Sequence, residues 1–265
     1  MVYLGKILKE LERLWPISSA DDWDRPGLSV GSIDQEVNKI LLSVDVTKAV
    51  IQEAIARGCQ LIVSHHPLLL RGVNDVSEQT LKGEVIALAI KNDVAIYSAH
   101  TNADKAEIGT ASALAELYGV SNIEVLDPES GHGLVGDLIP EQSLIEFATW
   151  IAKKLPSVAA GVKVAGDPES RIRRVALSPG AGDSNLGIAK AKGVDVFITS
   201  DLRHHPSQDF LEAPGSPRAL IDVSHWASEY SLLPKAQEAI ATLFSDIEVL
   251  ISDVRTDPWD FAVMQ

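Results

Sequence analysis

Between residues 39 and 98, short apolar runs of strand length alternate with helical patterns, and this alternation limits the possible folds more than any other feature of the chain. The runs are rich in leucine and β-branched residues, which favours buried strands. Strands that alternate with helices are typical of α/β folds whose mainly parallel sheet is covered by helices on both faces. We therefore expect a three-layer α/β fold. The expected strands are 40–44, 61–63 and 94–98, and the expected helices are 3–14, 48–57 and 76–92.

The second half of the chain repeats this pattern. The segment Gly-Cys-Gln-Leu-Ile-Val-Ser at 58–64 aligns without gaps with Gly-Val-Asp-Val-Phe-Ile-Thr at 193–199, which lies 135 residues later. Such a repeat indicates internal duplication, so we expect two related α/β lobes with mainly parallel sheets. The second copy is expected to contain strands over 174–178, 194–199 and 219–223 and a helix over 185–192. The lobes are expected over 1–127, completed by 225–265, and over 128–224, with the boundary inside 122–132.

The composition excludes several classes of partner. The chain has 37 acidic and 23 basic residues, a net charge of −14, which argues against nucleic acid or an anionic membrane as the main partner. The single cysteine, Cys59, rules out an internal disulfide, and no apolar run approaches the roughly 20 residues that a membrane span requires. The sequence opens directly into a helix pattern and not into a signal peptide. We therefore expect a soluble, cytoplasmic protein.

Histidines stand directly after several predicted strands, and two of them are followed four residues later by a carboxylate. In parallel sheets, ligands bind beyond the carboxyl ends of the strands. Imidazole is the commonest metal ligand in proteins, and carboxylate oxygens extend the range of metals that a site accepts. These positions therefore predict a metal site. The histidines are His65, His66, His100 and His225, the carboxylates are Asp104 and Glu229, and Asp45 also ends a predicted strand.

Four imidazoles and two carboxylates exceed the ligand set of one tetrahedral ion. A pair of metal ions that share a bridging carboxylate is the simplest interpretation, and such pairs serve hydrolysis. Plainer alternatives stay open for single residues. A histidine at a strand end can be a hydrogen-bonded core or rim residue, and Asp104 can be the N-cap of an alanine-rich helix that we expect to end near Leu117. The matched spacing in both halves of the chain favours the metal site.

Three loops have less decisive sequences. The segment 21–31 is dense in carboxylates and turn formers, and it is equally compatible with a surface loop that holds Trp23 on the core and with a wall of the site. The glycine-rich segment 180–182 predicts a tight turn first and an anion site second, because it lacks both dinucleotide and P-loop spacing. His204 and His205 belong either to a mobile loop that brings acid–base groups to the metals or to an exposed turn.

Five segments, taken in order, combine these features: Asp22-Trp23-Asp24-x-x-Gly27-Leu28-x-Val30-Gly31, His65-His66-Pro67, Ser98-Ala99-His100-Thr101-Asn102-x-Asp104, Thr199-x-Asp201-x-x-His204-His205 and His225-x-x-x-Glu229. Together they span nearly the whole chain and are specific in combination. The sequence resembles the GTP cyclohydrolase 1 type 2 homologue family, also called the NGG-interacting-factor-three-like family. This resemblance implies two related lobes, a dinuclear metal centre in the cleft between them, and ring-shaped homohexamers.

The resemblance also implies roles for single residues. Glu229 is expected to bridge the two metals, and His100 becomes a neighbouring group instead of a ligand. The identity of the two divalent ions stays open among Zn, Fe and Mn. The implied metal ligands are His65, His66, Asp104, His225 and Glu229, and the residues expected to move protons are His100, His204 and His205.

Two functions remain compatible with these residues. By resemblance, we expect a metal-dependent hydrolase that acts on a nucleotide or a related small molecule, as the name GTP cyclohydrolase implies. The alternative is a non-catalytic protein that binds or delivers metal, or that serves as a scaffold, and forms a ring. An open coordination position favours the hydrolase, whereas a fully ligated centre favours the alternative.

Overall fold

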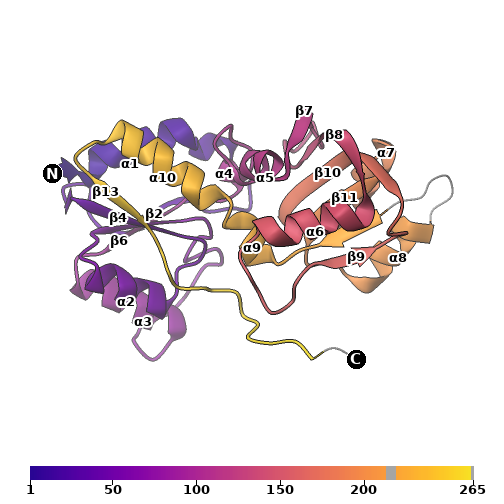
Figure 1. Cartoon of the computed structure of the whole chain (residues 1–265). Coiled ribbons are helices and arrows are strands. Elements are labelled where there is room, and N and C mark those ends of the chain that lie inside the picture. Colours follow the sequence, from indigo (N-terminus) through magenta and orange to yellow (C-terminus); the bar gives the residue numbers. More distant parts are fainter. Residues whose placement is uncertain (213–218, 264–265) are drawn as a thin grey trace. The chain divides into compact units, whose positions relative to one another are not determined.

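A computed structural model describes residues 1–212 and 219–263 of the chain (Figure 1). By its internal contacts the chain divides into two compact units. No helix in the described part of the chain has both the length and the apolar character that crossing a bilayer requires. Unit 1 comprises Met1–Ile108 and Leu233–Thr256, and unit 2 comprises Gly109–Leu232 and Asp257–Gln265.

Unit 1 is built on a five-stranded sheet in the order β13-β4-β5-β6-β2. The first four of these strands are parallel, and β2 runs antiparallel to β6. Strands β1 and β3 form a separate antiparallel ribbon. The elements of unit 1 are β1 (Val2–Tyr3), α1 (Leu4–Leu14), the 3₁₀ turn η1 (Ile17–Ser19), β2 (Gly27–Val30), β3 (Glu36–Val37), β4 (Lys39–Ser43), α2 (Lys48–Ala56), β5 (Leu61–Ser64), α3 (Leu81–Lys91), β6 (Ala95–Ser98), α4 (Thr101–Asp104), α10 (Leu232–Leu243) and β13 (Glu248–Ile251). The first residue of α10 belongs to unit 2.

Helices cover both faces of this sheet, with α1 and α10 on one face and α2 and α3 on the other (Figure 1). Alternate residues of each strand point to opposite faces, so each face receives its own set of apolar side chains. On the face of α2 and α3, Leu41, Ile62 and Ile96 of the sheet are fully buried in one cluster with Val50 and Ala89 of the helices. The expected three-layer arrangement is therefore present in unit 1.

Unit 2 forms, within the described residues, a six-stranded sheet in the order β7-β8-β10-β11-β12-β9. Strands β10, β11 and β12 are parallel, whereas β7, β8 and β9 join by antiparallel pairs. Its elements are α5 (Thr110–Tyr118), β7 (Val120–Val125), β8 (Leu134–Ser143), α6 (Leu144–Lys154), β9 (Lys163–Ala165), β10 (Arg171–Ala181), η2 (Asp183–Asn185), α7 (Leu186–Ala191), β11 (Val196–Ser200), α8 (His204–Glu212), β12 (Ala219–Asp222) and α9 (His225–Glu229).

Two apolar clusters place helices on both faces of the second sheet as well. One cluster joins Val175 and Ile198 of the sheet to Phe147 of α6 and to α5, and the other joins Phe197 to Leu186 of α7 and to α8. The prediction of a mainly parallel sheet is wrong for this unit, because a hairpin and a short edge strand add antiparallel pairs to the parallel centre. The sheets of the two units are mixed.

The parallel centres of the two sheets have the same construction. Strands β4, β5 and β6 neighbour one another in chain order, and so do β10, β11 and β12. The register also repeats, since Ile40 pairs with Leu61 in unit 1 and Val175 pairs with Val196 in unit 2. Both members of the second pair lie 135 residues after their counterparts, the same offset as the sequence repeat.

The stretch 122–132, expected to separate the lobes, lies instead in the β7–β8 hairpin, and the unit boundary falls earlier, after Ile108. Helix α5, which follows this boundary, packs against β10 and β7 of the second sheet. It therefore belongs to unit 2. Residues that close a hairpin have the same turn-forming composition as a linker, so composition alone does not distinguish the two.

The helices of the structure agree with the expectations to different degrees. The helix expected from residue 76 begins at Leu81, because the Thr80 hydroxyl accepts a hydrogen bond from the Gly83 amide and caps it there. The alanine-rich helix expected to end near Leu117 is present as α5, and the separate short helix α4 precedes it. His204 begins α8, so it lies in neither a mobile loop nor a turn. Pro206 is tolerated in the first turn of this helix, because its missing N–H is not needed there.

Candidate metal centre

Unit 1 brings three imidazole rings together at the carboxyl ends of β5 and β6. The ring centroids of His65, His66 and His100 lie 5.1 to 5.5 Å from one another. One ring nitrogen from each can be chosen so that all three lie within 4.8 Å of one another, which is a spacing that a single metal ion can span. The parallel register of β5 and β6 produces this cluster, because it ends both strands at the same edge of the sheet.

His65 is buried and held in one orientation. Its Nδ1 lies 2.9 Å from the carbonyl oxygen of Ala99, which can only accept, so Nδ1 carries the proton. The neutral ring then has its lone pair on Nε2, and this atom lies 3.5 Å from Oδ1 of Asp104. A nitrogen lone pair and a carboxylate oxygen at this separation both attract a cation.

His66 is oriented by Asp45. Its Nδ1 donates to Oδ1 of Asp45 over 2.7 Å, and the other oxygen of this carboxylate accepts from the hydroxyl of Thr256. A carboxylate that takes the Nδ1 proton of a histidine fixes the tautomer and makes Nε2 a better metal ligand. Asp45, which the sequence places at a strand end, therefore acts through His66.

His100 pairs with a carboxylate from the distant loop 21–31. Its Nδ1 donates to Oδ1 of the buried Asp24 over 2.9 Å, and Oδ2 accepts from both the amide and the hydroxyl of Thr101. Burial alone would raise the pKa of the Asp24 carboxyl, but the hydrogen bonds from His100 and Thr101 outweigh it and hold this pKa well below its usual range. Asp24 is therefore an anion next to His100.

The loop 21–31 therefore contributes to the site, although not through the residue that stands out in its sequence. Trp23 is 57% exposed and does not rest on the core, whereas its neighbour Asp24 is buried. The Trp23 ring meets the His100 ring in a T-shaped contact, with centroids 5.8 Å apart. Asp104 is the last residue of α4 and does not cap α5, which Gly109 precedes.

Unit 2 repeats part of this arrangement with one histidine. His225 begins α9 shortly after β12 ends at Asp222, because the Ser224 hydroxyl caps the helix by accepting from the Ala227 amide. One turn later, Oε1 of the buried Glu229 lies 2.9 Å from Nε2 of His225. The other ring nitrogen, Nδ1, donates to Oδ2 of Asp201 over 2.7 Å.

Asp201 directly follows the strand β11 and has a left-handed conformation, with φ at 55°. The hydrogen bond from His225 lowers the pKa of the Asp201 carboxyl, and burial opposes this effect without cancelling it. Because an ionised carboxylate accepts the Nδ1 proton, Nε2 of His225 presents its lone pair to Glu229. Two acceptors 2.9 Å apart are stable only with a cation between them, either a proton or a metal ion.

Gly180 keeps one side of this pair open. A Cβ at this position would lie 2.5 Å from Oε1 of Glu229 and 3.3 Å from Nε2 of His225, and the backbone has φ of +67°. The amide of Gly180 donates to the hydroxyl of Ser228, which itself donates to the carbonyl of His225. The glycine-rich segment is thus a strand end that makes room beside the pair. The nitrogen and oxygen donors, and the space that Gly180 leaves, fit a divalent metal ion.

His204 and His205 lie on the first turn of α8 with exposed side chains. Their rings contact each other in a T-shaped arrangement, with centroids 5.0 Å apart. Of the predicted site residues, unit 1 thus groups His65, His66, His100 and Asp104, and unit 2 groups His225 and Glu229. Four further residues, whose roles the motifs did not reveal, hold or border the groups: Asp24, Asp45, Asp201 and Gly180.

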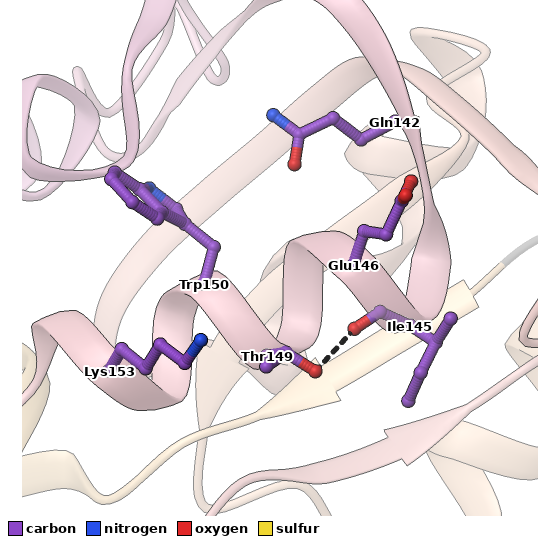
Figure 2. A pocket seen from close by; sticks show the side chains of 6 residues that line it. All are labelled: Gln142, Ile145, Glu146, Thr149, Trp150 and Lys153. Atoms are coloured by element: carbon purple, nitrogen blue, oxygen red, sulfur yellow. Dashed lines mark hydrogen bonds between the residues drawn. The ribbon is translucent and has the colours of Figure 1, made fainter.

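A separate hollow of about 340 Å³ runs along α6 in unit 2 (Figure 2). It is open, and its lining contains no imidazole. Trp150 and Lys153 of α6 stand at its side, and Trp150 also lies under the ammonium group of Lys154, 4.3 Å from the ring centroid. None of the predicted site residues lines this hollow.

The fold and these side chains define a class: a two-unit α/β protein in which duplicated parallel centres carry imidazole and carboxylate groups at their strand ends. The family model described as Duf34/NIF3 (NGG1p interacting factor 3) matches residues 2–258. The chain belongs to this family, which confirms the resemblance read from the motifs.

Individual relatives cover nearly the whole chain. A Streptomyces coelicolor protein named GTP cyclohydrolase 1 type 2 homolog is 40% identical over 270 residues, which cover 98% of this chain and 94% of the relative. A Clostridium perfringens protein of the same name is 34% identical and covers 97% and 99%. The crystal structure of a Bacillus cereus protein related to NIF3 matches the fold with a TM-score of 0.90, at 23% identity and 98% and 99% coverage.

Proposed function

We propose that this chain is a metal-dependent hydrolase with two divalent ions, which acts on a nucleotide or a related small molecule. Glu229 is the bridging ligand in this proposal, as the motif resemblance implies. Zn, Fe and Mn all suit a set of imidazole and carboxylate ligands. The proposed metal ligands are His65, His66, Asp104, His225 and Glu229.

The observation that carries the proposal is the way the histidines are held. In His65, His66 and His225, Nδ1 donates to an oxygen, which leaves Nε2 as the nitrogen that can bind metal. In His65 and His225 this Nε2 faces the carboxylate of Asp104 or Glu229. Metal-binding histidines typically have such an oxygen partner on the second nitrogen.

Each unit supplies part of the proposed ligand set. Unit 1 supplies His65, His66 and Asp104, and unit 2 supplies His225 and Glu229. That two ions share Glu229 is the part of the proposal that rests on the motif resemblance.

The pair of ions, when bound, would act as Lewis acids that polarise the substrate and lower the pKa of water. The chain itself supplies the proton transfer. His100 is the group best suited to this, because the ionised Asp24 holds its Nδ1 proton and fixes the ring with Nε2 as the exchanging atom. His204 and His205, on the exposed start of α8, are the other groups proposed to move protons.

Turnover by metal-loaded protein tests the proposal. Purified chain with Zn²⁺ or Mn²⁺ is assayed on GTP and on a panel of nucleotides and phosphoesters, beside Glu229→Gln and the surface control Glu212→Gln. We expect turnover that depends on metal, falls at least a hundredfold in Glu229→Gln and is unchanged in Glu212→Gln. Absence of metal-dependent turnover with tightly bound metal would favour the metal-binding or metal-delivery role instead.

We also propose that the chain forms a homohexamer, as the motif resemblance implies. Light scattering on the purified chain measures its mass in solution. A mass of six chains supports the proposal, and the mass of one or two chains refutes it.

A further inference from the structure

We infer that Trp23 is a stacking surface for a flat heteroaromatic ring of the substrate, such as a purine, beside His100. This inference rests on the proposed function, because it names the chemical group that the site receives. Its first support is exposure. Trp23 has 57% of its surface accessible, although burying a side chain of this size is worth several kcal/mol to a fold.

The position of Trp23 distinguishes it from other exposed aromatic residues. Its ring makes a T-shaped contact with the ring of His100, at an interplanar angle of 82°. His100 is one of the three clustered imidazoles of unit 1 and the proposed proton-transfer group. A ring stacked on Trp23 would therefore lie next to the reactive groups.

The residues on both sides of Trp23 are anchored. The amide of Asp21 donates to the hydroxyl of Thr101 over 2.9 Å, and the carboxylate of Asp21 pairs with Lys105. On the other side, Asp24 is fixed by His100 and by both donors of Thr101. The loop is thus attached at α4 two residues before the tryptophan and one residue after it. A surface that is already in place loses little conformational entropy on binding, which favours its use in recognition.

Charge argues that Trp23 contacts a neutral ring and not a phosphate. Two cations that contact this loop, Arg25 and Lys105, are already engaged by its own oxygens. Arg25 donates to the carbonyl of Asp22 and to that of Asp24, and Lys105 pairs with Asp21. The carboxylate of Asp22, next to Trp23, repels a polyphosphate. The face of an aromatic ring, in contrast, stacks on any base without requiring charge.

Trp150 provides a matched control. It is also an exposed tryptophan, 42% accessible, but it lies on α6 beside a hollow whose lining contains no imidazole (Figure 2). If any exposed tryptophan of this chain binds purine rings, replacing Trp150 will weaken binding as much as replacing Trp23. If the inference is right, replacing Trp23 weakens the binding of purine rings and replacing Trp150 does not.

Binding titrations test this without relying on turnover. Metal-loaded wild type, Trp23→Ala, Trp23→Phe and Trp150→Ala are titrated by calorimetry with GTP, guanosine, adenosine, cytidine and inorganic tripolyphosphate. We expect Trp23→Ala to lose roughly tenfold or more in affinity for GTP and for purine nucleosides, and Trp23→Phe to recover most of it. Tripolyphosphate should bind all four proteins equally, and their melting temperatures should agree.

Three results would overturn the inference: no nucleoside binds the wild type, Trp23→Ala binds them as well as the wild type, or tripolyphosphate binding falls in parallel. The outcome is separable from that of the proposed function. Metal-dependent hydrolysis of GTP or another purine nucleotide, with equal KM and equal rates in wild type and Trp23→Ala, would keep the hydrolase and refute the stacking surface. Ring binding that depends on Trp23, without turnover of any substrate, would keep the stacking surface and refute the hydrolase.

Discussion

The two units carry related groups on the same parallel framework, but they support them differently. In unit 1, three imidazoles gather, and His100 takes its carboxylate partner from a loop before the sheet. In unit 2, one imidazole, His225, takes its partner Asp201 from the end of the neighbouring strand β11. The carboxylate four residues after the histidine also differs in its contact. Glu229 faces His225 itself, whereas Asp104 faces His65.

Comparison of the two units shows which features they share. Both units keep a histidine at the end of the third parallel strand, an oxygen acceptor on its Nδ1, and a carboxylate one helical turn later. What differs is the burial of the acceptor: Asp24 has no exposed side-chain surface, whereas the side chain of Asp201 is 57% exposed. Because a buried charge depends entirely on its partners, the two acceptors should differ strongly in their contribution to stability.

The largest effect is expected for Asp24→Asn. The substitution removes the charge that accepts from His100 and Thr101 in a buried position, so we expect a loss of about 3 kcal/mol in the free energy of unfolding near pH 7. Urea unfolding measures it. Asp22→Asn, in the same loop but exposed, is the control and should change little.

The difference in unfolding free energy between wild type and Asp24→Asn should depend on pH. The pKa of Asp24 is lowered in the folded state, so its ionisation stabilises the fold fully above the ordinary value of 3.8 and loses this effect as the pH falls below it. The stability difference between wild type and Asp24→Asn should stay constant from pH 7 to pH 5 and shrink below about pH 4. A difference that grows on acidification would contradict the assigned role.

A smaller effect is expected for Gly180→Ala, compared with Gly193→Ala. Both glycines have positive φ, +67° and +64°, so both substitutions incur the backbone strain of about 1 kcal/mol. Only at Gly180 does the new Cβ also crowd Glu229 and His225, whereas nothing lies within 4 Å of a Cβ at Gly193. We expect about 2 kcal/mol for Gly180→Ala and weakened metal binding, measured by urea unfolding and metal titration. Equal behaviour of the two variants would argue that Gly180 serves the turn alone.

The smallest effect on stability is expected for Asp201→Asn. Its carboxylate is largely solvated, so the free energy of unfolding should fall by less than about 1 kcal/mol. Metal affinity should nevertheless fall roughly tenfold to a hundredfold, because Asp201 orients His225. Chelator competition measures the affinity. A stability loss as large as that of Asp24→Asn would remove the distinction between a buried and an exposed acceptor.

The framework could be predicted from the sequence because its signals are local. The strands at 40–44 and 61–63 and the repeat 135 residues later follow from runs of apolar residues and from their alignment. The spacing from His225 to Glu229 is likewise local, since one helical turn brings residues four apart to the same face. These features require no knowledge of distant contacts.

The partners of the histidines could not be predicted in the same way. Asp24 lies 76 residues from His100 in the chain, Asp45 lies 21 from His66, and Asp201 lies 24 from His225. Such pairs depend on strand register and loop path, which no short pattern encodes.

Two expectations failed for a different reason, because patterns with the same composition can have different structures. A hairpin end at 122–132 resembles a linker, and the proline after His204 and His205 is compatible with both a loop and a helix start. The antiparallel edges of the second sheet were missed because no periodicity distinguishes the direction in which an added strand runs.

The most direct test of the central claim is the metal content of the chain. Elemental analysis, after equilibration with Zn²⁺ or Mn²⁺ and removal of free ions, should find two ions per wild-type chain. His66→Ala in unit 1 and His225→Ala in unit 2 should each lower this number, because the proposed function assigns a metal ligand to each of these positions. Less than one ion per wild-type chain, or a full complement in His225→Ala, would contradict the account.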